Sequence, residues 1–356
     1  MIYHLAQYLQ KYYSFFNLFR YVSFRAIAAL LSSIMFSFIF GNWFIKKIAS
    51  NGVFTSKPRE WTPESHLTKS DTPTMGGIFV LVVCILNTLL WNNLSYVNVW
   101  IFLLCLVAFG LVGFADDWAK LRAGRGISAK AKFLLQISSA LIVMVTWYFF
   151  AEPNTQLCVP FYKWFMPSLG IFIIPWGVFL LVATSNAVNL TDGLDGLAAG
   201  PLVANFTTFS ILTYLAGHKF LANYLHIPYT GTAEVAIVGT TLIGAMLGFL
   251  WYNTYPAQVF MGDVGSLALG AAVAFMAIVS RQELLLPLVG GIFVLETLSV
   301  IIQVATFKLL GRRMFRMAPI HHHFELLGWR EIKITVRFWI ISVILSLITL
   351  LTIKIR

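Results

Sequence analysis

The sequence predicts an all-α polytopic membrane protein, a bundle of about ten transmembrane helices, on two observations. First, 59% of the 356 residues are hydrophobic and only 11% are charged. A soluble domain of this length needs more polar surface than that composition supplies, so the bilayer must be the solvent of the chain. Second, apolar stretches of about 20 residues, the length that spans the hydrocarbon core, recur along the whole sequence.

We treat residues 1–356 as a single membrane domain, because neither a repeat of fixed period nor a soluble domain interrupts the apolar stretches. Residues 1–21 are aromatic and mixed in polarity, which predicts an interfacial helix rather than a cleaved signal peptide. The three scattered cysteines are expected to pack in the interior. The predicted spans lie near residues 22–45, 75–92, 97–115, 132–150, 169–188, 198–216, 233–252, 264–280, 285–307 and 334–353.

Basic residues indicate the orientation of these spans. The loops after the first and third spans and the stretch between the ninth and tenth carry most of the 25 Lys and Arg residues. Because cytoplasmic loops are enriched in Lys and Arg, we assign these loops to the cytoplasm and both termini to the periplasm. The cytoplasmic side also carries every aspartate, which predicts one shared active site on its loops: Asp71, Asp116, Asp117, Asp192, Asp195 and Asp263.

Two adjacent acids end the third predicted span, in the motif GFADDWAK. Asp116 and Asp117 would then lie at a helix C-terminus, where each negative charge opposes the helix dipole by about 0.3–1 kcal/mol. Either a solvated helix end tolerates the pair, or function holds the two acids there. Because neighbouring helical residues point about 100° apart, one carboxylate can face a metal while the other accepts a proton.

The motif NLTDGLDG follows the fifth predicted span. It brings Asp192 and Asp195 to one face if the turn is helical. Asn189 adds an amide that can bind a metal or a phosphate, and an ordinary turn with local side-chain hydrogen bonds is the alternative. In the motif MGDVGSLALG, Asp263 adjoins the first turn of the eighth span. There it either caps the helix or helps to hold Mg²⁺, which usually binds one or two carboxylates together with substrate phosphates.

Three consecutive histidines lie between the last two predicted spans, in MAPIHHHFELLGWRE. Neighbouring side chains diverge in a helix or a strand, so a zinc site made by His321, His322 and His323 is not expected. One or two of them are expected to face a phosphate or a hydroxyl, with an exposed cationic loop as the alternative. Glu296, inside the ninth span, is expected to be protonated, paired or close to a helix break around Gly290.

The chemistry of this set is typical of phosphoryl transfer with Mg²⁺. Lys69, Thr72 and Thr74 of the motif HLTKSDTPTMGG offer further donors to anionic oxygens. The chain has neither an activated serine or cysteine motif nor a nucleotide-binding glycine loop. Acids bind the metal and accept a proton, and cations neutralise phosphate charge. The basic side is expected to attract anionic substrates and the lipid bilayer, and no nucleic-acid partner is predicted.

The motifs TPTMGG, FADDWAK, NLTDGLDG, MGDVGSLALG and PIHHHFE, in this order, resemble the phospho-N-acetylmuramoyl-pentapeptide transferase family. They cover residues from about 66 to 331. The resemblance implies transfer of phospho-MurNAc-pentapeptide from UDP-MurNAc-pentapeptide to undecaprenyl phosphate, giving undecaprenyl-pyrophosphoryl-MurNAc-pentapeptide (lipid I) and UMP. It further implies dependence on Mg²⁺, a multi-pass location in the bacterial inner membrane, and a homodimer.

The same resemblance implies roles for individual residues. Asp116, Asp117 and Asp263 correspond to the acidic catalytic core, with Asp116 as candidate base for the lipid phosphate. Mg²⁺ would be held by Asp263, with Asn189 as a second ligand. Asp71 departs from the glycine that is common in the family at that position, a difference that concerns only the local loop. Lys69, Asp195 and Phe260 resemble the nucleoside pocket, and the phosphates and sugar would be surrounded by Lys132, Asn253, Thr74, Asp192, His321 and His322.

Two alternatives stay open from the sequence. A polyprenyl-phosphate GlcNAc-1-phosphate transferase of the same superfamily shares the Asp-rich motifs, and the block PIHHHFELLGWRE favours the muramoyl-pentapeptide branch over it. An ion-coupled secondary transporter also carries acids in the membrane, but its sites lie near the midplane on broken helices of repeated halves. Here the acids lie at span ends on one side, and no repeat is found.

Overall fold

A computed structural model describes residues 1–50, 72–162 and 164–355 of the chain. These residues form helices and loops, with one isolated β-bridge between Gln156 and Ser168 and no strand among them. The α-helices are α1 (Ile2–Leu9), α2 (Val22–Ser50), α3 (Gly77–Trp91), α4 (Val97–Ala123), α5 (Ala129–Ala151), α6 (Ile173–Thr191), α7 (Ala199–Gly217), α8 (Lys219–Leu225), α9 (Ala233–Asn253), α10 (Gly262–Val279), α11 (Leu286–Val289), α12 (Gly291–Leu310), α13 (Ile320–Leu326) and α14 (Glu331–Thr352). Short 3-10 helices are η1 (Ser14–Arg20), η3 (Gly170–Phe172) and η4 (Glu283–Leu285).

Every predicted span overlaps an α-helix. Eight of the described helices are long and apolar enough to cross a bilayer, namely α2, α4, α5, α6 with η3, α9, α10, α12 and α14. Helix α3 is apolar but shorter, and α7 corresponds to the predicted span near 198–216. The all-α polytopic membrane fold is therefore confirmed for the described residues, whereas the number of ten spans and the side on which the termini lie stay predictions.

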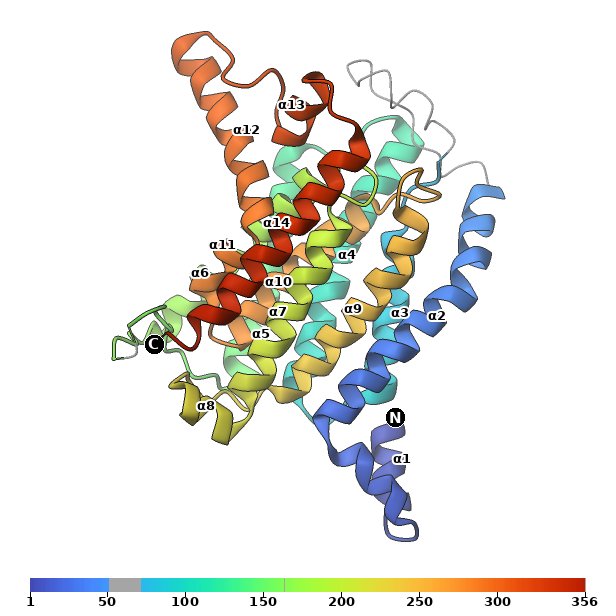
Figure 1. Cartoon of the computed structure of the whole chain (residues 1–356), viewed down its shortest axis with the longest axis vertical. Helices are drawn as coiled ribbons and strands as arrows, with labels where there is room; N and C mark the ends of the chain where they lie inside the picture. The colour runs from blue at the N-terminus through green and yellow to red at the C-terminus, as the bar shows by residue number, and fades with distance from the viewer. Residues whose placement is uncertain (51–71, 163, 356) are drawn as a thin grey trace.

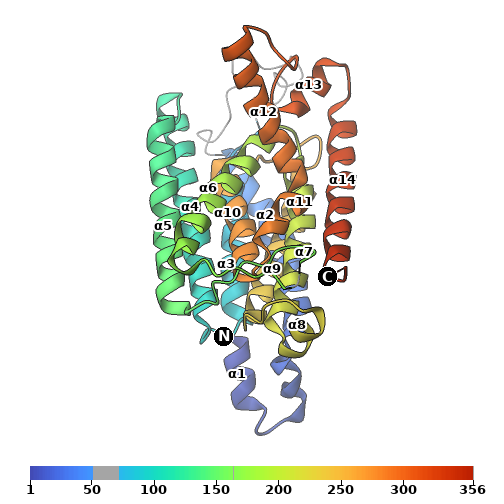
Figure 2. The ribbon, with the colours of Figure 1, turned by 90° about the vertical axis from the view of Figure 1, so that its left-hand side faces the viewer.

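Helix α10 forms the centre of the bundle. All of its residues from Val264 to Val279 are buried, and it packs against α3, α4, α6 and α7 (Figure 2). Its sequence is rich in Gly and Ala, which lets neighbouring helices approach closely where no water is available to drive packing. The first turn of α10, with Asp263, is thus held by surrounding helices on several sides.

Helix α4 corrects one prediction from the sequence. The span was expected to end near residue 115, with Asp116 and Asp117 at its C-terminus in a solvent-facing loop region, held there by function or tolerated by a solvated helix end. Instead the helix continues to Ala123, Lys120 and Arg122 lie in its last turn, and both aspartates are buried. The acids therefore lie on helices of the bundle, and the expectation of solvent-facing loops at these positions is wrong.

The ninth predicted span is broken at Gly290. Helix α11 ends at Val289 and α12 begins at Gly291, so the helix break that was one of the alternatives considered for Glu296 is present. Helix α12 leans away from the other helices, with α13 near its far end, while α1 lies at the opposite end of the molecule (Figures 1 and 2). The interfacial position of residues 1–21 stays a prediction, and the three cysteines are buried and free, as expected.

Candidate active site

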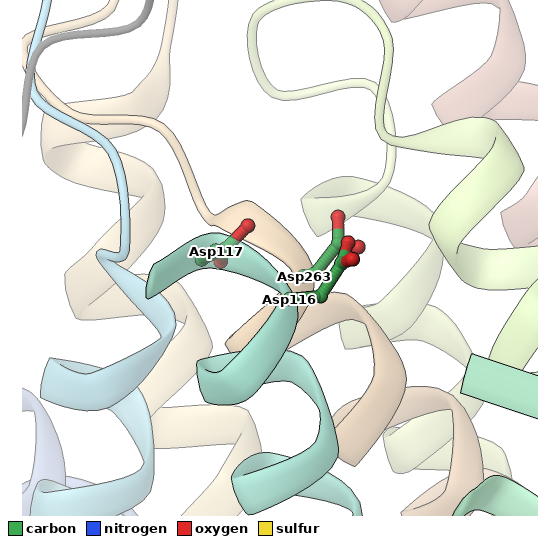
Figure 3. A group of neighbouring side chains, drawn as sticks. All are labelled: Asp116, Asp117 and Asp263. Carbon is green, nitrogen blue, oxygen red and sulfur yellow. The ribbon is translucent and has the colours of Figure 1, made fainter. Parts of the chain in front are cut away.

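Three aspartates meet where the last turns of α4 pass the first turn of α10. Asp116 and Asp117 come from α4 and Asp263 from α10 (Figure 3). The two helices can approach this closely because Gly113 has no side chain. A Cβ at Gly113 would collide with the backbone carbonyl of Asp263. One carboxylate oxygen from each aspartate lies within 4.8 Å of the others, and we call these three residues the aspartate triad.

Lys120 contacts all three members of the triad. Its Nζ lies 2.8 Å from Asp116 Oδ2, 3.2 Å from Asp117 Oδ1 and 3.0 Å from Asp263 Oδ2. The side chain of Lys120 is 34% exposed, whereas those of Asp116 and Asp117 are 5% exposed. Lys120 was not predicted as a site residue from the sequence. Its spacing of four and three residues from the two acids on one helix was the signal that could have found it.

Lys132 and two backbone N–H groups also contact the carboxylates of the triad. Lys132, from the first turn of α5, contacts Asp263 Oδ2 and lies 3.3 Å from Asp116 Oδ2. The backbone N–H of Ile127 donates to Asp116 Oδ1 over 2.9 Å, and that of Val264 donates to Asp117 Oδ2 over 3.2 Å. Charged and backbone donors together hold carboxylates that would otherwise repel one another.

Asn189 reaches the triad from the end of α6. Its Nδ2 donates to Asp263 Oδ1 over 2.9 Å and to the hydroxyl of Ser266 over 2.8 Å. Ser266 was not predicted as a site residue. It follows Asp263 by one helical turn and so lies on the same face of α10. In this structure Asn189 orients the Asp263 carboxylate.

Asp192 lies just past the end of α6 and is half-buried. Its pKa is raised to about 7, chiefly by burial and further by the negative charges of Asp263 and Asp117. A carboxyl group that gains and loses its proton near neutral pH is suited to binding an ionisable phosphate or to passing a proton.

Asp195 and Asn253 hold loops together. Asp195 Oδ2 accepts a hydrogen bond from the N–H of Ala257 over 3.0 Å. Asn253 Oδ1 accepts from the N–H of Gly196 over 3.1 Å, and its Nδ2 donates to the carbonyl of Val259 over 2.8 Å. These bonds join the turn after α6 to the loop between α9 and α10, so both side chains shape the region beside the triad.

Thr74 and Phe260 lie on two paired segments next to the triad. The N–H of Phe260 donates to the carbonyl of Pro73, and the N–H of Gly76 donates to the carbonyl of Phe260, both over 2.8 Å. Thr74 and Phe260 are half-buried, so each leaves part of its side chain accessible. Lys69 and Asp71 lie outside the described residues.

The two predicted site histidines of α13 each lie beside a different carboxylate. His321 is buried, and its Nδ1 lies 3.1 Å from Oε2 of the buried Glu296 of α12. His322 Nδ1 lies 2.6 Å from Glu325 Oε2. The side chains diverge as expected for neighbours. His321 packs against Gly193, where a Cβ would clash with the ring, so α13 adjoins the turn that carries Asp192.

The donor set of the triad fits a hard divalent cation. Around Mg²⁺, with oxygen ligands at about 2.1 Å, neighbouring ligand atoms are about 3 Å apart and opposite ones about 4.2 Å apart. The triad oxygens all lie within 4.8 Å of one another, so rotation of the side chains can bring them to these separations. The ammonium group of Lys120 already occupies a position between the three carboxylates, which indicates that a cation fits there.

Comparisons with known proteins identify the family. The profile of glycosyl transferase family 4 matches residues 99–281, about half of the chain, and signature 1 of phospho-N-acetylmuramoyl-pentapeptide-transferase matches residues 69–81. Phospho-N-acetylmuramoyl-pentapeptide-transferase of Syntrophus aciditrophicus (strain SB) is 49% identical over 362 residues, which cover 100% of both chains. The chain belongs to the phospho-N-acetylmuramoyl-pentapeptide-transferase family. As a member of this family it is a polytopic membrane transferase, and the region matched to glycosyl transferase family 4 contains the whole triad.

Proposed function

We propose that the chain transfers phospho-MurNAc-pentapeptide from UDP-MurNAc-pentapeptide to undecaprenyl phosphate, giving lipid I and UMP for peptidoglycan synthesis. An oxygen of the lipid phosphate forms a bond to the phosphorus attached to the sugar, and the bond from that phosphorus to the UMP oxygen breaks. The observation that supports this most is the full-length identity to a transferase of this name, combined with a triad of acids and two lysines at one end of a helical bundle.

Mg²⁺ is the proposed cofactor. Asp263 would hold it, with Asn189 either as a second ligand or as the group that orients Asp263. Asp116 and Asp117 lie close enough to contact the same ion. When bound, the ion would neutralise charge on the pyrophosphate and polarise its phosphoryl oxygens. The carboxylates and Lys132 are set in position by backbone donors and by each other, so these groups need little rearrangement when charge develops.

Asp116 is the proposed base for the lipid phosphate. Its Oδ1 accepts from the backbone of Ile127, and its Oδ2 contacts Lys132, so both oxygens have fixed directions. A carboxylate oriented in this way can take the proton of a phosphate monoester whose second pKa is about 6.

The remaining predicted residues would bind the donor substrate. Phe260 offers a half-buried ring on which the uracil base can stack. Lys69 and Asp195 would bind the same nucleoside. Lys132 would bind a phosphate directly, and Thr74, Asp192, His321 and His322 would surround the phosphates and sugar. Asn253 would act by shaping the loop that carries Phe260.

The protein would work in the bacterial inner membrane, with the triad on the cytoplasmic side and a second copy of the chain as partner in a homodimer. This orientation gives the triad access to a soluble nucleotide substrate. Both substrates are anionic, and the basic residues around the triad side of the bundle would attract them.

Release of UMP by the detergent-purified protein, with undecaprenyl phosphate and Mg²⁺, tests the proposal. UDP-MurNAc-pentapeptide and UDP-GlcNAc are supplied in parallel reactions. Turnover of the first donor alone, abolished by EDTA, is expected. Turnover of UDP-GlcNAc alone would move the chain to the GlcNAc-1-phosphate branch. If neither donor reacts where a known family member is active, the transferase assignment fails and ion-coupled transport becomes the function to test.

A further inference from the structure

The position of the Lys120 ammonium group inside the triad is not explained by catalysis with bound Mg²⁺. The ammonium group of Lys120 lies between the three carboxylates, 2.8–3.2 Å from one oxygen of each. An ammonium group has three donors and here finds three acceptors, which is its full complement. The same three carboxyl groups are the candidate ligands of the metal. The lysine and the ion therefore compete for one position.

The charge balance of the cluster favours an exchange. Three carboxylates and the two ammonium groups of Lys120 and Lys132 leave the cluster with one excess negative charge. If a divalent ion replaced Lys120, with Lys132 kept in place, the cluster would be neutral. If both lysines stayed beside the ion, the cluster would carry excess positive charge in a largely buried site, which is unfavourable.

The path that Lys120 would take is open. Its side chain is 34% exposed and lies at the rim, whereas that of Lys132 is 18% exposed. It comes from the last turn of α4, which ends at Gly124 in a left-handed conformation. A long flexible side chain at this position can swing towards solvent without moving the helix.

We propose that Lys120 is a built-in counter-ion that holds the aspartate triad together in the metal-free protein and is displaced when the metal enters. The inference rests on the proposed metal site. It assigns Lys120 a function that precedes catalysis: the lysine keeps the carboxylates gathered and lowers the affinity of the site for the metal. Displacement returns the ammonium group to the rim, where the anionic substrate must approach.

Metal binding to variants tests the competition. Mn²⁺ serves as the probe, and the loss of the electron paramagnetic resonance signal of the free ion measures the bound fraction. In Lys120→Met we expect a dissociation constant at least about tenfold lower than in the wild type, equivalent to about 1.4 kcal/mol. Arg122→Met is the matched control, because Arg122 lies on the same turn and is exposed, with its guanidinium 5.0 Å from the ring of Trp118.

A second measurement uses the wild-type protein and so does not depend on the folding of a variant. Reductive methylation followed by peptide mass spectrometry gives the rate of modification of each lysine. Addition of Mg²⁺ is expected to speed the modification of Lys120 several-fold, because its ammonium leaves the carboxylates. The exposed Lys130 at the start of α5 is the internal control, and its rate should stay unchanged.

The outcomes separate this inference from the proposed metal site. If Mn²⁺ binds with equal affinity to the wild type and Lys120→Met, or if Arg122→Met tightens binding as much, the counter-ion inference is overturned while the metal site stands. A rate of Lys120 methylation that Mg²⁺ leaves unchanged or lowers, with Mn²⁺ binding intact, overturns it as well. Absence of Mn²⁺ binding in every form of the protein overturns the inference and the metal site together.

Discussion

Two buried charge clusters at opposite ends of the bundle are built in contrasting ways. The first pairs Arg25 of α2 with Glu234 of α9 through two contacts of 2.8 and 2.6 Å. The second is the aspartate triad with its two lysines. Glu234 lies at the start of α9, whose 21 residues span about 30 Å before the chain reaches the triad.

The Arg25–Glu234 pair is balanced in charge and closed to solvent. One acid meets one base in a bidentate geometry, Glu234 also accepts from the N–H of Asn93, and the ring of Tyr3 lies 4.4 Å from the guanidinium carbon. The triad has more acids than bases and is partly open to solvent at Lys120. A balanced buried pair fastens helices together, whereas an unbalanced cluster keeps a capacity to bind a cation. Local charge balance thus distinguishes a structural cluster from a functional one.

The largest effect is expected from loss of a triad carboxylate. Asp263→Asn removes an acid that both lysines contact and that is the proposed metal ligand, and kcat should fall at least about a thousandfold, or about 4 kcal/mol. The folded structure should persist because one of three mutually repelling charges is removed, and Asn189 can still donate to the new side chain. Release of UMP measures the rate. Wild-type turnover in Asp263→Asn, Asp116→Asn and Asp117→Asn would remove the triad from catalysis.

The opposite result is expected at the balanced pair. Arg25→Met leaves the buried Glu234 without its partner, which should destabilise the protein by about 3–5 kcal/mol. The protein that remains folded should keep its kcat. A thiol-reactive dye reports unfolding, because Cys84, Cys105 and Cys158 are free and buried. The double variant Arg25→Met/Glu234→Met should recover part of the loss. A slower reaction without loss of stability would contradict the structural role.

A smaller effect is expected from Phe260, which lies beside the triad and does not belong to either cluster. Phe260→Ala should raise KM for the UDP-linked substrate about tenfold, about 1.4 kcal/mol, by removing the stacking face. kcat should change little. The backbone bonds of this residue to Pro73 and Gly76 remain in the variant, so its thermal stability serves as the control. An unchanged KM would exclude Phe260 from the nucleoside pocket.

The smallest effect is expected from the charge of Asp192 in metal-free protein. Its pKa of about 7 in the folded protein lies above the ordinary aspartate value of 3.8, so the folded state binds the proton more tightly than the unfolded state. Folding stability should therefore fall as the pH rises from about 4 to about 7. In Asp192→Asn this pH-dependent loss of folding stability should be absent, because the amide does not titrate.

The Tm of Asp192→Asn, measured in EDTA, should exceed that of the wild type at pH 8, and the difference should vanish near pH 4. Asp195→Asn is a poor control because the carboxylate of Asp195 holds the loop at Ala257. If the wild type had the higher Tm at pH 8, the folded protein would stabilise Asp192 as a carboxylate, contrary to its raised pKa.

Sequence reasoning placed the helices better than it placed their ends. Hydropathy ends a span at the first charges, but the backbone bonds of α4 continue to Ala123. The burial of Asp116 and Asp117 could not be predicted, because transfer scales treat each charge alone. Here Lys120 and Lys132 compensate the acids. Lys132 was predicted as a phosphate ligand and Lys120 was not, although both contact the triad.

Contacts between residues far apart in the sequence were the second feature that could not be predicted. Glu296 was expected to be paired or near a helix break, and the structure shows both, with His321 as the partner. Asp195 and Asn253 were expected at the substrate, and their roles there stay predictions, but their bonds to Ala257, Gly196 and Val259 show that they also hold loops. No local pattern specifies such long-range backbone partners.

By itself the sequence determined that the chain is a bundle of membrane helices, because the thickness of the bilayer sets the length of each apolar stretch. It also predicted that Asp116, Asp117 and Asp263 act together, since their residue types and motifs are local, and the structure brings these three together. The tertiary structure alone decided how they meet. The close approach of α4 and α10 at Gly113 sets the register that brings Asp263 to Asp116 and Asp117, and packing between helices is a property of no single segment.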